Sequence, residues 1–300
     1  MPRHLNLVLA GCETMLRRLG NKSRLLPKLL PLFPENITTF IDMFMGSGAV
    51  TFAMVDRVKY LIANDNDDEV FNLFMVVKER KEELINAVEL IPHHEKLFEY
   101  WKEQKEGDSV WQATRFLMLS NFGYMGKPDT LRFGNIANKL QTLSGIDEAF
   151  KKIVSTQFQF MSCDFRKVLS RIPWRHETDI PKGFIYADPP YLETGNTFQS
   201  SFTEDDTEEL FNILVNQPVN FALSEFRHPL VMALAEEHGL HVTSLGERRN
   251  LKNRREEILI TNYQPERRQG SLFPSEGTAA SPANNGLQPD QTSAEQISML

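Results

Sequence analysis

Short apolar runs rich in β-branched and aromatic residues alternate with amphipathic stretches along the chain, and these patterns predict strands and helices respectively. We expect strands at 38–42, 60–64, 156–163, 183–187, 219–224, 240–245 and 257–263. The last two strands would form a hairpin at the edge of the sheet. Strands that alternate with helices favour an α/β fold with a mostly parallel sheet.

Helical periodicity lies between these strands and in a long block that interrupts the alternation. Ser23 is a good N-cap for a helix that would reach about Leu30, with Pro27 in its first turn. We expect further helices at 70–78, 81–90, 94–106, 110–122, 136–153 in two pieces, 166–171, 204–214 and 228–238.

The long helical block divides the chain into parts. Residues 16–66 and 156–263 would form one α/β domain, with residues 67–155 as an inserted helical lobe. A plain helical subdomain without a role in recognition is the alternative for this lobe. Residues 1–15 carry weak signals and would be flexible. Residues 264–300 are rich in Ser, Pro, Gln and Asn, and this composition predicts a disordered tail.

A glycine turn follows the first expected strand, in Asp42-Met43-Phe44-Met45-Gly46-Ser47-Gly48. Glycines at such a turn let a ligand approach the backbone. Asp65 follows the next strand, 19 residues after Gly46 (46 to 65), the spacing at which dinucleotide-binding units place an acid on ribose hydroxyls. Thr51 stands in place of the third glycine of that fingerprint. An adenosine cofactor without a pyrophosphate therefore fits better, and S-adenosylmethionine is the obvious one.

Two further residues fit a ligand site near this turn. Asp164 ends the strand expected at 156–163, where its carboxylate is a natural partner for an adenine amino group. Lys22 lies in a Gly-Asn turn, where a cation would meet a carboxylate or a phosphate. A solvent-facing lysine is the alternative for Lys22.

The strand at 183–187 ends in Asp188-Pro189-Pro190-Tyr191. Two prolines forbid its continuation, so a carboxylate and an aromatic ring are held at the carboxyl end of a strand, where open α/β sheets bind ligands. Asp188 and a nearby backbone carbonyl would accept hydrogen bonds from the amino group of a flat ring, and Tyr191 would stack on that ring. An ordinary turn is the alternative, and the four residues fit adenine and cytosine alike.

Composition and charge narrow the function classes. The net charge of −7 does not indicate a uniformly basic nucleic-acid binder, although the basic stretches at 1–34 and 248–255 fit either phosphate contacts or solvated faces. The two cysteines, Cys12 and Cys163, exclude a disulfide framework and a thiolate metal site. We expect no metal and a reducing, cytoplasmic location. No apolar run reaches membrane-spanning length, so we expect no membrane association.

Six stretches, in this order along the chain, resemble motifs of the DNA adenine-N6 methyltransferase family, in its Dam-like alpha group. They are Leu19–Ser23, Asp42–Gly48, Asn64–Asn66, Cys163–Phe165, Asp188–Tyr191 and Arg254–Tyr263. The resemblance implies a Rossmann-like, S-adenosylmethionine-dependent methyltransferase sheet with a helical target-recognition lobe inserted at 67–155. Arg18 departs from the aromatic residue that relatives often carry near the cofactor, and the loop 121–135 is shorter than in relatives that read GATC.

The resemblance also implies roles for single residues. The cofactor would be bound by Lys22, Asp42, Phe44, Gly46, Gly48, Asp65, Asp164, Phe165 and Asp188. The catalytic residues would be Asp188, Pro189, Pro190 and Tyr191.

The activity that the resemblance implies is methyl transfer from S-adenosylmethionine to the exocyclic N6 amine of adenine in double-stranded DNA, with the base flipped out of the helix. Hydrogen bonds from the amine to Asp188 and to the Pro189 carbonyl would stabilise the developing positive charge. The enzyme would act as a monomer, in a restriction–modification, phage or housekeeping setting. An RNA or cytosine-N4 amino-methyltransferase and a non-catalytic DNA-binding module are the alternatives.

Overall fold

The computed structural model describes most of the chain between residues 15 and 266. The residues outside the description are 1–14, 19, 93, 105, 125–126, 132–135, 173–181, 193–201, 250–253 and 267–300. The predicted flexible N-terminus and disordered tail lie almost wholly among these residues, as does the middle of the basic stretch 248–255. All described residues belong to the compact unit Met1–Arg267.

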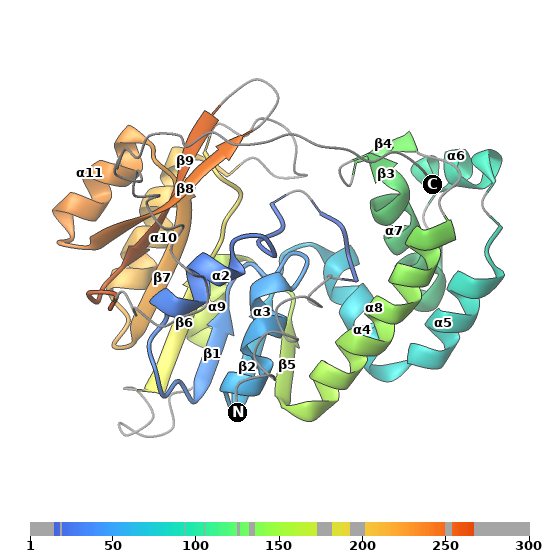
Figure 1. The fold of residues 1–300 in the computed structure, drawn as a ribbon, viewed down its shortest axis with the longest axis horizontal. Helices are drawn as coiled ribbons and strands as arrows, with labels where there is room; N and C mark the ends of the chain where they lie inside the picture. Colours follow the sequence, from blue (N-terminus) through green and yellow to red (C-terminus); the bar gives the residue numbers. More distant parts are fainter. Residues whose placement is uncertain are drawn as a thin grey trace, which may run out of the picture. The chain divides into compact units, whose positions relative to one another are not determined.

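Seven strands of the described chain form one mixed sheet in the order β5-β2-β1-β6-β7-β9-β8 (Figure 1). They are β1 (Thr39–Asp42), β2 (Tyr60–Asn64), β5 (Gln157–Met161), β6 (Gly183–Ala187), β7 (Asn220–Phe226), β8 (His241–Arg249) and β9 (Arg254–Thr261). The first five pair in parallel, whereas β9 is antiparallel to both of its neighbours. The predicted α/β fold with a mostly parallel sheet is therefore confirmed.

The strand order reverses between β1 and β6, which pair in the middle of the sheet. From β1 the chain continues outward to β2 and β5, and from β6 it continues in the other direction to β7. Asp42, the last residue of β1, is in register with Tyr186 of β6. Open α/β sheets bind ligands beyond the carboxyl ends of strands at such a reversal. The fold thus puts Asp188, directly after β6, at the preferred position for a site.

The two C-terminal strands form the predicted hairpin, but only β8 is the edge strand. β9 is inserted between β7 and β8. Its register pairs Glu257 with Phe226 at the end of β7. An acidic residue of the hairpin is thereby brought beside the end of a parallel strand, which the sequence did not predict.

Helices lie between most of the strands. They are α2 (Leu26–Leu29), α3 (Ala49–Met54), α4 (Asp68–Glu79), α5 (Lys81–Leu90), α6 (Glu95–Glu103), α7 (Ser109–Phe122), α8 (Ile136–Ser155), α9 (Phe165–Val168), α10 (Glu204–Val215) and α11 (Pro229–Glu237). Short 3-10 turns continue α2, α3 and α9. A two-stranded ribbon follows α7 and consists of β3 (Gly123–Tyr124) and β4 (Lys127–Leu131).

The N-cap predicted at Ser23 is wrong. α2 begins at Leu26, after Leu25, and has no side-chain cap. The Asn21 carboxamide oxygen instead accepts hydrogen bonds from the Ser23 amide (2.8 Å) and from the Ser23 hydroxyl (2.6 Å). Because this polar turn uses Ser23, the helix starts later than its N-cap signal indicates.

The helix expected in two pieces at 136–153 is one continuous helix, α8. Gly145 lies inside it, where glycine costs about 1 kcal/mol relative to alanine. Apolar residues of α8, such as Ile146 and Ile153, are buried in the core. Their packing offsets the weak local propensity, and the helix runs through the glycine.

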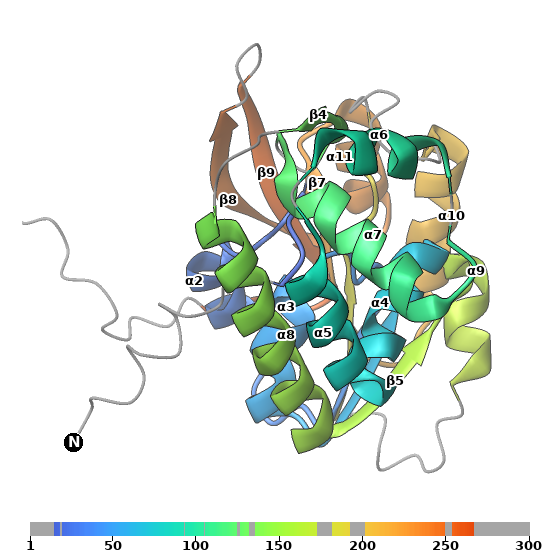
Figure 2. The ribbon, with the colours of Figure 1, turned by 90° about the vertical axis from the view of Figure 1, so that its right-hand side faces the viewer.

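Alternate residues of the central strands face two apolar layers, as the period of a strand requires. Phe40 and Phe184 lie in a layer with residues of α2 to α8, and Ile41 and Ile185 in a layer with residues of α9, α10 and α11. The helices α5, α7 and α8 pack on one another (Figure 2) and share the first layer with the sheet. One core therefore joins these helices to the sheet. Because the core is shared, it does not mark the boundaries of the lobe expected at 67–155, and these boundaries stay a prediction.

The segment before α2 is fastened to the helices by a buried amide. The Asn121 side chain, at the end of α7, donates to the Met15 carbonyl and accepts from the Arg17 amide, both at 2.9 Å. It also donates to the Thr142 hydroxyl of α8 at 2.9 Å. Met15 lies so close to α8 that a Cβ at Gly145 would be 2.8 Å from the Met15 Cα. This anchoring fixes the path of the chain that leads to Lys22.

We expect Gly145→Ala to lower the melting temperature, although alanine favours an isolated helix by about 1 kcal/mol. The added methyl group would collide with the Met15 backbone, which must then shift. Gly107→Ala is the matched control, because nothing lies within 4 Å of a Cβ at that position. Thermal unfolding of both variants tests this, and a more stable Gly145→Ala protein would contradict the close approach.

Candidate active site

Four of the predicted acidic residues lie at the carboxyl ends of neighbouring parallel strands. Asp42 ends β1, Asp65 follows β2, and Asp188 follows β6. Asp164 follows β5 and is the N-cap of α9. Because the carboxyl ends of parallel strands meet at one edge of a sheet, the fold gathers these residues on that edge, as the sequence predicts.

The glycine turn after β1 has the backbone geometry that its sequence indicates. Gly46 and Gly48 have φ angles of 52° and 76°, in the left-handed region that favours glycine. A Cβ at Gly48 would lie 2.6 Å from the Phe52 ring, whereas one at Gly46 would meet nothing within 4 Å. Asp65 accepts a hydrogen bond from the Gly46 amide at 2.7 Å. The turn is therefore fixed by Asp65 and leaves open space beside Gly46.

Asp42 stabilises the turn from within the protein. It is 1% exposed. Its carboxylate accepts hydrogen bonds from the Thr51 hydroxyl and from the Phe44 amide. Burial raises the pKa of Asp42 to about 7, and the hydrogen bond from Thr51 opposes this rise. Thr51, which stands where a dinucleotide-binding unit has its third glycine, is thus a partner of Asp42 that the sequence analysis missed.

Asp65 interacts with the charge of Arg18, which the resemblance places near the cofactor but does not count among the cofactor-binding residues. Both Asp65 oxygens accept backbone hydrogen bonds, one from Gly46 and one from the Asp67 amide at 2.9 Å. Burial raises the pKa of Asp65, and the Arg18 guanidinium is the main opposing charge. Arg18 Nη2 lies 2.7 Å from Asp67 Oδ2. Its Nη1 is buried with no hydrogen-bond partner in the described chain.

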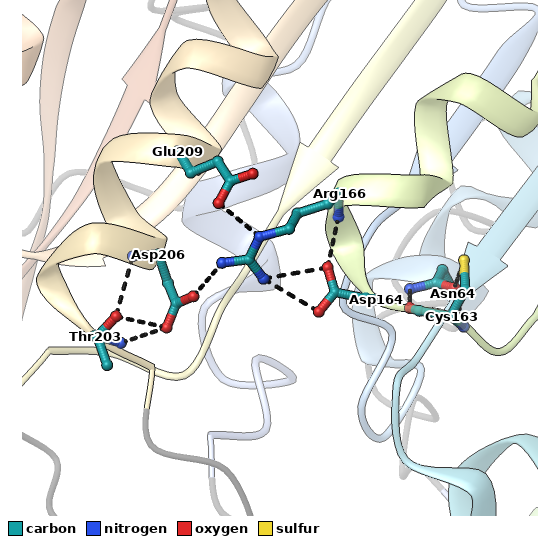
Figure 3. A network of polar contacts seen from close by, with 7 residues as sticks. All are labelled: Asn64, Cys163, Asp164, Arg166, Thr203, Asp206 and Glu209. Carbon is teal, nitrogen blue, oxygen red and sulfur yellow. Dashed lines mark hydrogen bonds and ion pairs between the residues drawn. The ribbon is translucent and has the colours of Figure 1, made fainter.

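Asp164 is held by the neighbouring Arg166 (Figure 3). Asp164 Oδ1 accepts the Arg166 amide at 2.9 Å, and Arg166 Nη1 lies 3.1 Å from Oδ2. The same guanidinium binds Asp206 and Glu209 of α10. Asp164 is still 38% exposed in its side chain, so a ligand can reach the oriented carboxylate.

Asn64 connects the ends of three strands rather than facing a ligand. Its amide nitrogen donates to the Met43 carbonyl (3.1 Å) and to the Cys163 carbonyl (2.9 Å). Its oxygen accepts from the Cys163 amide at 3.1 Å. The buried carboxamide therefore fixes the spacing of the turns that carry the predicted cofactor residues.

Three phenylalanines form an apolar group beside these turns. Phe44 and Phe165, both predicted to bind the cofactor, have ring centroids 5.8 Å apart. Phe202, before α10, lies 6.0 Å from Phe44 and 5.5 Å from Phe165. Sequence analysis missed Phe202, because it is an isolated aromatic residue in a polar segment.

Lys22 lies beside Asp188 and Tyr191 and is 3% exposed, so its solvent-facing alternative is excluded. Its ammonium nitrogen is 2.7 Å from Asp188 Oδ1 and 3.2 Å from Glu257 Oε1. It also lies 4.6 Å from the centroid of the Tyr191 ring. Burial raises the pKa of Asp188, and the Lys22 charge opposes this rise. Lys22 thus stabilises the ionised form of Asp188.

Tyr191 is buried and fixed at both ends. Its hydroxyl donates to Glu257 Oε1 at 2.8 Å. Its ring packs edge-to-face on Phe226, with centroids 4.6 Å apart. Pro189 is buried and Pro190 half-buried beside it. The stacking of Tyr191 on a bound ring stays a prediction.

Two further buried acids interact with the charges of Asp188 and Lys22. The sequence analysis did not predict them as site residues. Glu257 of β9 and Glu225 of β7 are each 1% exposed. Burial raises the pKa of Glu225 to about 9, so this carboxyl is neutral at pH 7. Glu257, by contrast, binds Lys22 and Tyr191. Glu225 is an ordinary glutamate within a strand that pairs with a distant strand. Glu257 lies in the stretch Arg254–Tyr263 that resembles a family motif, but the resemblance assigns it no role.

Comparisons with known proteins agree with this arrangement. A family model described as D12 class N6 adenine-specific DNA methyltransferase matches residues 19–241. A type II methyltransferase of Lactococcus lactis subsp. cremoris is 25% identical, over 81% of this chain and 93% of its own length. The modification methylase StsI of Streptococcus sanguinis is 25% identical, over 84% of this chain. This chain spans only 43% of the StsI methylase.

Solved structures of other proteins resemble this chain with low TM-scores and low sequence identity. The rRNA methyltransferase aviRa of Streptomyces viridochromogenes has a TM-score of 0.40 and 12% identity, covering 86% of this chain and 93% of that one. A precorrin-6y methyltransferase of Geobacter metallireducens has a TM-score of 0.35 and 10% identity, covering 79% and 84%. Because these TM-scores are low, we describe the fold by its own strand order and not by its likeness to these structures.

We expect Asp42→Asn to remove a pH dependence of stability. The folded-state pKa of Asp42, about 7, lies above its ordinary value of 3.8, so between these values the folded protein keeps a proton that the unfolded chain releases. Raising the pH from 4 to 7 therefore lowers the free energy of unfolding, by up to about 1.4 kcal/mol per pH unit from this group.

Denaturant unfolding at pH 4.5 to 8 checks this prediction. The stability of Asp42→Asn relative to the unmodified protein should increase with pH up to about 7 and then level off. Asp56→Asn is the control, because Asp56 is exposed. A difference that does not change with pH would contradict the raised pKa.

Proposed function

Because this chain belongs to the D12 class N6 adenine-specific DNA methyltransferase family, we propose that Asp188 binds the adenine amine while the glycine turn, Asp65 and Asp164 bind the methyl donor. The family makes the chain an adenine-specific DNA methyltransferase with DNA as its substrate. One observation carries the assignment of Asp188. It is an acidic side chain held by a buried lysine directly after a central strand, at the reversal of strand order.

The residues at the glycine turn fit S-adenosylmethionine. The open space beside Gly46 allows a ligand to approach the backbone. Asp65 and Asp164 are acceptors for ribose hydroxyls and for an adenine amino group. Phe44 and Phe165 supply an apolar surface for a flat ring. When bound, this cofactor supplies an electrophilic methyl group on a sulfonium.

Asp188 would act on the amine through hydrogen bonding. The amine of adenine is a weak nucleophile, because its lone pair is delocalised into the ring. Hydrogen bonds from the amine to the Asp188 carboxylate and to the Pro189 carbonyl would localise that lone pair on nitrogen. The same acceptors stabilise the positive charge that develops there. The two prolines hold these acceptors in place, so little entropy is lost when the amine binds.

The amine of a stacked base cannot reach a buried carboxylate, so the target base would be flipped out of the duplex. Tyr191 would then contact the flipped ring. The named relatives are a type II methyltransferase and a modification methylase, so we propose that the enzyme modifies DNA in a restriction–modification system. A single chain holds every residue in this proposal, and we propose that it acts as a monomer.

Asp188→Asn should reduce methyl transfer by about a hundredfold or more, since the acceptor charge beside the developing cation is lost. The measurement is incorporation of labelled methyl from S-adenosylmethionine into unmethylated plasmid DNA. Asp205→Asn is the matched control, because Asp205 is exposed in the first turn of α10. Equal incorporation by Asp188→Asn would reject the role of Asp188.

The labelled nucleic acid also distinguishes the alternatives. Digestion to nucleosides should yield N6-methyladenine and no N4-methylcytosine, and matched RNA should remain unlabelled. Label in RNA or cytosine would support the alternative methyltransferases. A protein that binds DNA without any label would support the non-catalytic module.

Asp164→Ala should weaken binding of S-adenosylmethionine by about tenfold, a loss typical of one hydrogen bond to a charged group. The measurement is the stabilisation that the cofactor adds to thermal unfolding, which depends on its concentration and affinity. Asp108→Ala is the matched control, because Asp108 is likewise an N-cap, of α7, and lies outside the proposed site. Both variants lose a cap, but only Asp164→Ala should lose cofactor-dependent stabilisation. An unchanged cofactor effect would contradict the role of Asp164.

A further inference from the structure

The Asp188 carboxylate, which would accept a hydrogen bond from the target amine, already forms an ion pair with Lys22. Asp188 Oδ1 lies 2.7 Å from the Lys22 ammonium. Both side chains are largely removed from water, with exposed fractions of 16% for Asp188 and 4% for Lys22. An ammonium and an adenine amine offer the same kind of N–H donor, so they compete for one carboxylate. The amine therefore shares the Asp188 carboxylate with Lys22, and Asp188 is a stronger acceptor for the amine when Lys22 has another partner.

Glu257 is that partner within the described chain. Its Oε1 lies 3.2 Å from the Lys22 ammonium and is buried. A small movement of the ammonium toward Glu257 would release Asp188 without leaving Lys22 unpaired. Moving a lysine charge away from every carboxylate in such a buried place would be costly.

The formal charges of Lys22, Asp188 and Glu257 also favour a role for Glu257. Lys22 contributes +1, and Asp188 and Glu257 contribute −1 each, which leaves −1 for the cluster. The amine nitrogen gains positive charge as its bond to the methyl group forms. A cluster with a net negative charge stabilises that nitrogen, whereas a neutral Lys22–Asp188 pair alone would not.

Glu257 also fixes the aromatic residue of the motif. The Tyr191 hydroxyl donates to the same Oε1 that faces Lys22. The Lys22 ammonium lies over the Tyr191 ring, 4.6 Å from its centroid. One carboxylate therefore holds both groups that border Asp188.

We infer that Glu257 is a positioning residue for methyl transfer: it takes over the Lys22 ammonium, so that the Asp188 carboxylate is available to the target amine. The inference rests on the proposed function of Asp188. It assigns no contact between Glu257 and the base or the cofactor. Glu257 acts through Lys22 and Tyr191 only.

The test uses the full chain and four proteins: unmodified, Glu257→Gln, Lys22→Met, and the double variant. Glutamine keeps the size of the side chain and an acceptor for the Tyr191 hydroxyl, but it removes the charge that holds Lys22. Glu256→Gln is the matched control, because Glu256 is the neighbouring residue of β9 and pairs with Arg227 outside the cluster.

The readouts are the single-turnover rate of methyl transfer to unmethylated plasmid DNA and, separately, the cofactor-dependent thermal stabilisation. We expect Glu257→Gln to lower the rate by about tenfold or more, the coupling expected for contacting charged residues. Its stabilisation by the cofactor should stay unchanged. Adding Lys22→Met to Glu257→Gln should recover part of the rate, because the competing ammonium is gone. A merely structural role of Glu257 would give no such recovery.

Two results would overturn the inference alone: a Glu257→Gln protein as fast as Glu256→Gln, or a double variant no faster than Glu257→Gln. If Glu257→Gln does not fold, Glu257→Asp replaces it, since the shorter side chain keeps the charge but withdraws it from Lys22. This variant should also be slower than the control, and equal rates would overturn the inference. If the unmodified protein labels no DNA, the proposed function fails and the inference fails with it.

Discussion

The need to hold a largely desolvated carboxylate beside a cation is the constraint on which the candidate site depends. Asp188 follows a central strand and loses most of its hydration, so its charge requires a partner. Lys22 supplies it from a segment far away in the sequence. That segment is fixed by the Asn121 amide and by the close approach of Met15 to Gly145. The packing of the helices thus determines where the cation lies.

The other acids at the same edge of the sheet are stabilised differently, and the differences fit their proposed roles. Asp42 is enclosed and stabilises the glycine turn from within, and its role as a cofactor contact stays a prediction. Asp65 is held by backbone amides beside Arg18. Asp164 is oriented by Arg166 yet remains accessible. Only Asp188 lies against an ammonium that another buried acid, Glu257, also contacts.

The family match identifies the reaction class, and the sheet order places the candidate residue Asp188 at the reversal between β1 and β6. The helices at 68–155 share a core with the sheet, so any recognition surface on them is built on the same framework as the catalytic motif. In the described part of the chain, each helix is too short or too polar to span a membrane.

The sequence by itself determined the strands, the glycine turn and the acids at strand ends, because these depend on local periodicity, on backbone freedom and on where strands stop. Tertiary structure decided the rest. The sequence predicts that Lys22 meets a carboxylate or a phosphate, contacts the cofactor or faces solvent, and only the fold shows that its ammonium lies at Asp188. Glu257 lies in the stretch Arg254–Tyr263 that resembles a family motif, but only the insertion of β9 between β7 and β8 brings it beside Lys22. Contacts between residues distant in sequence are set by strand order and packing, which local patterns do not encode.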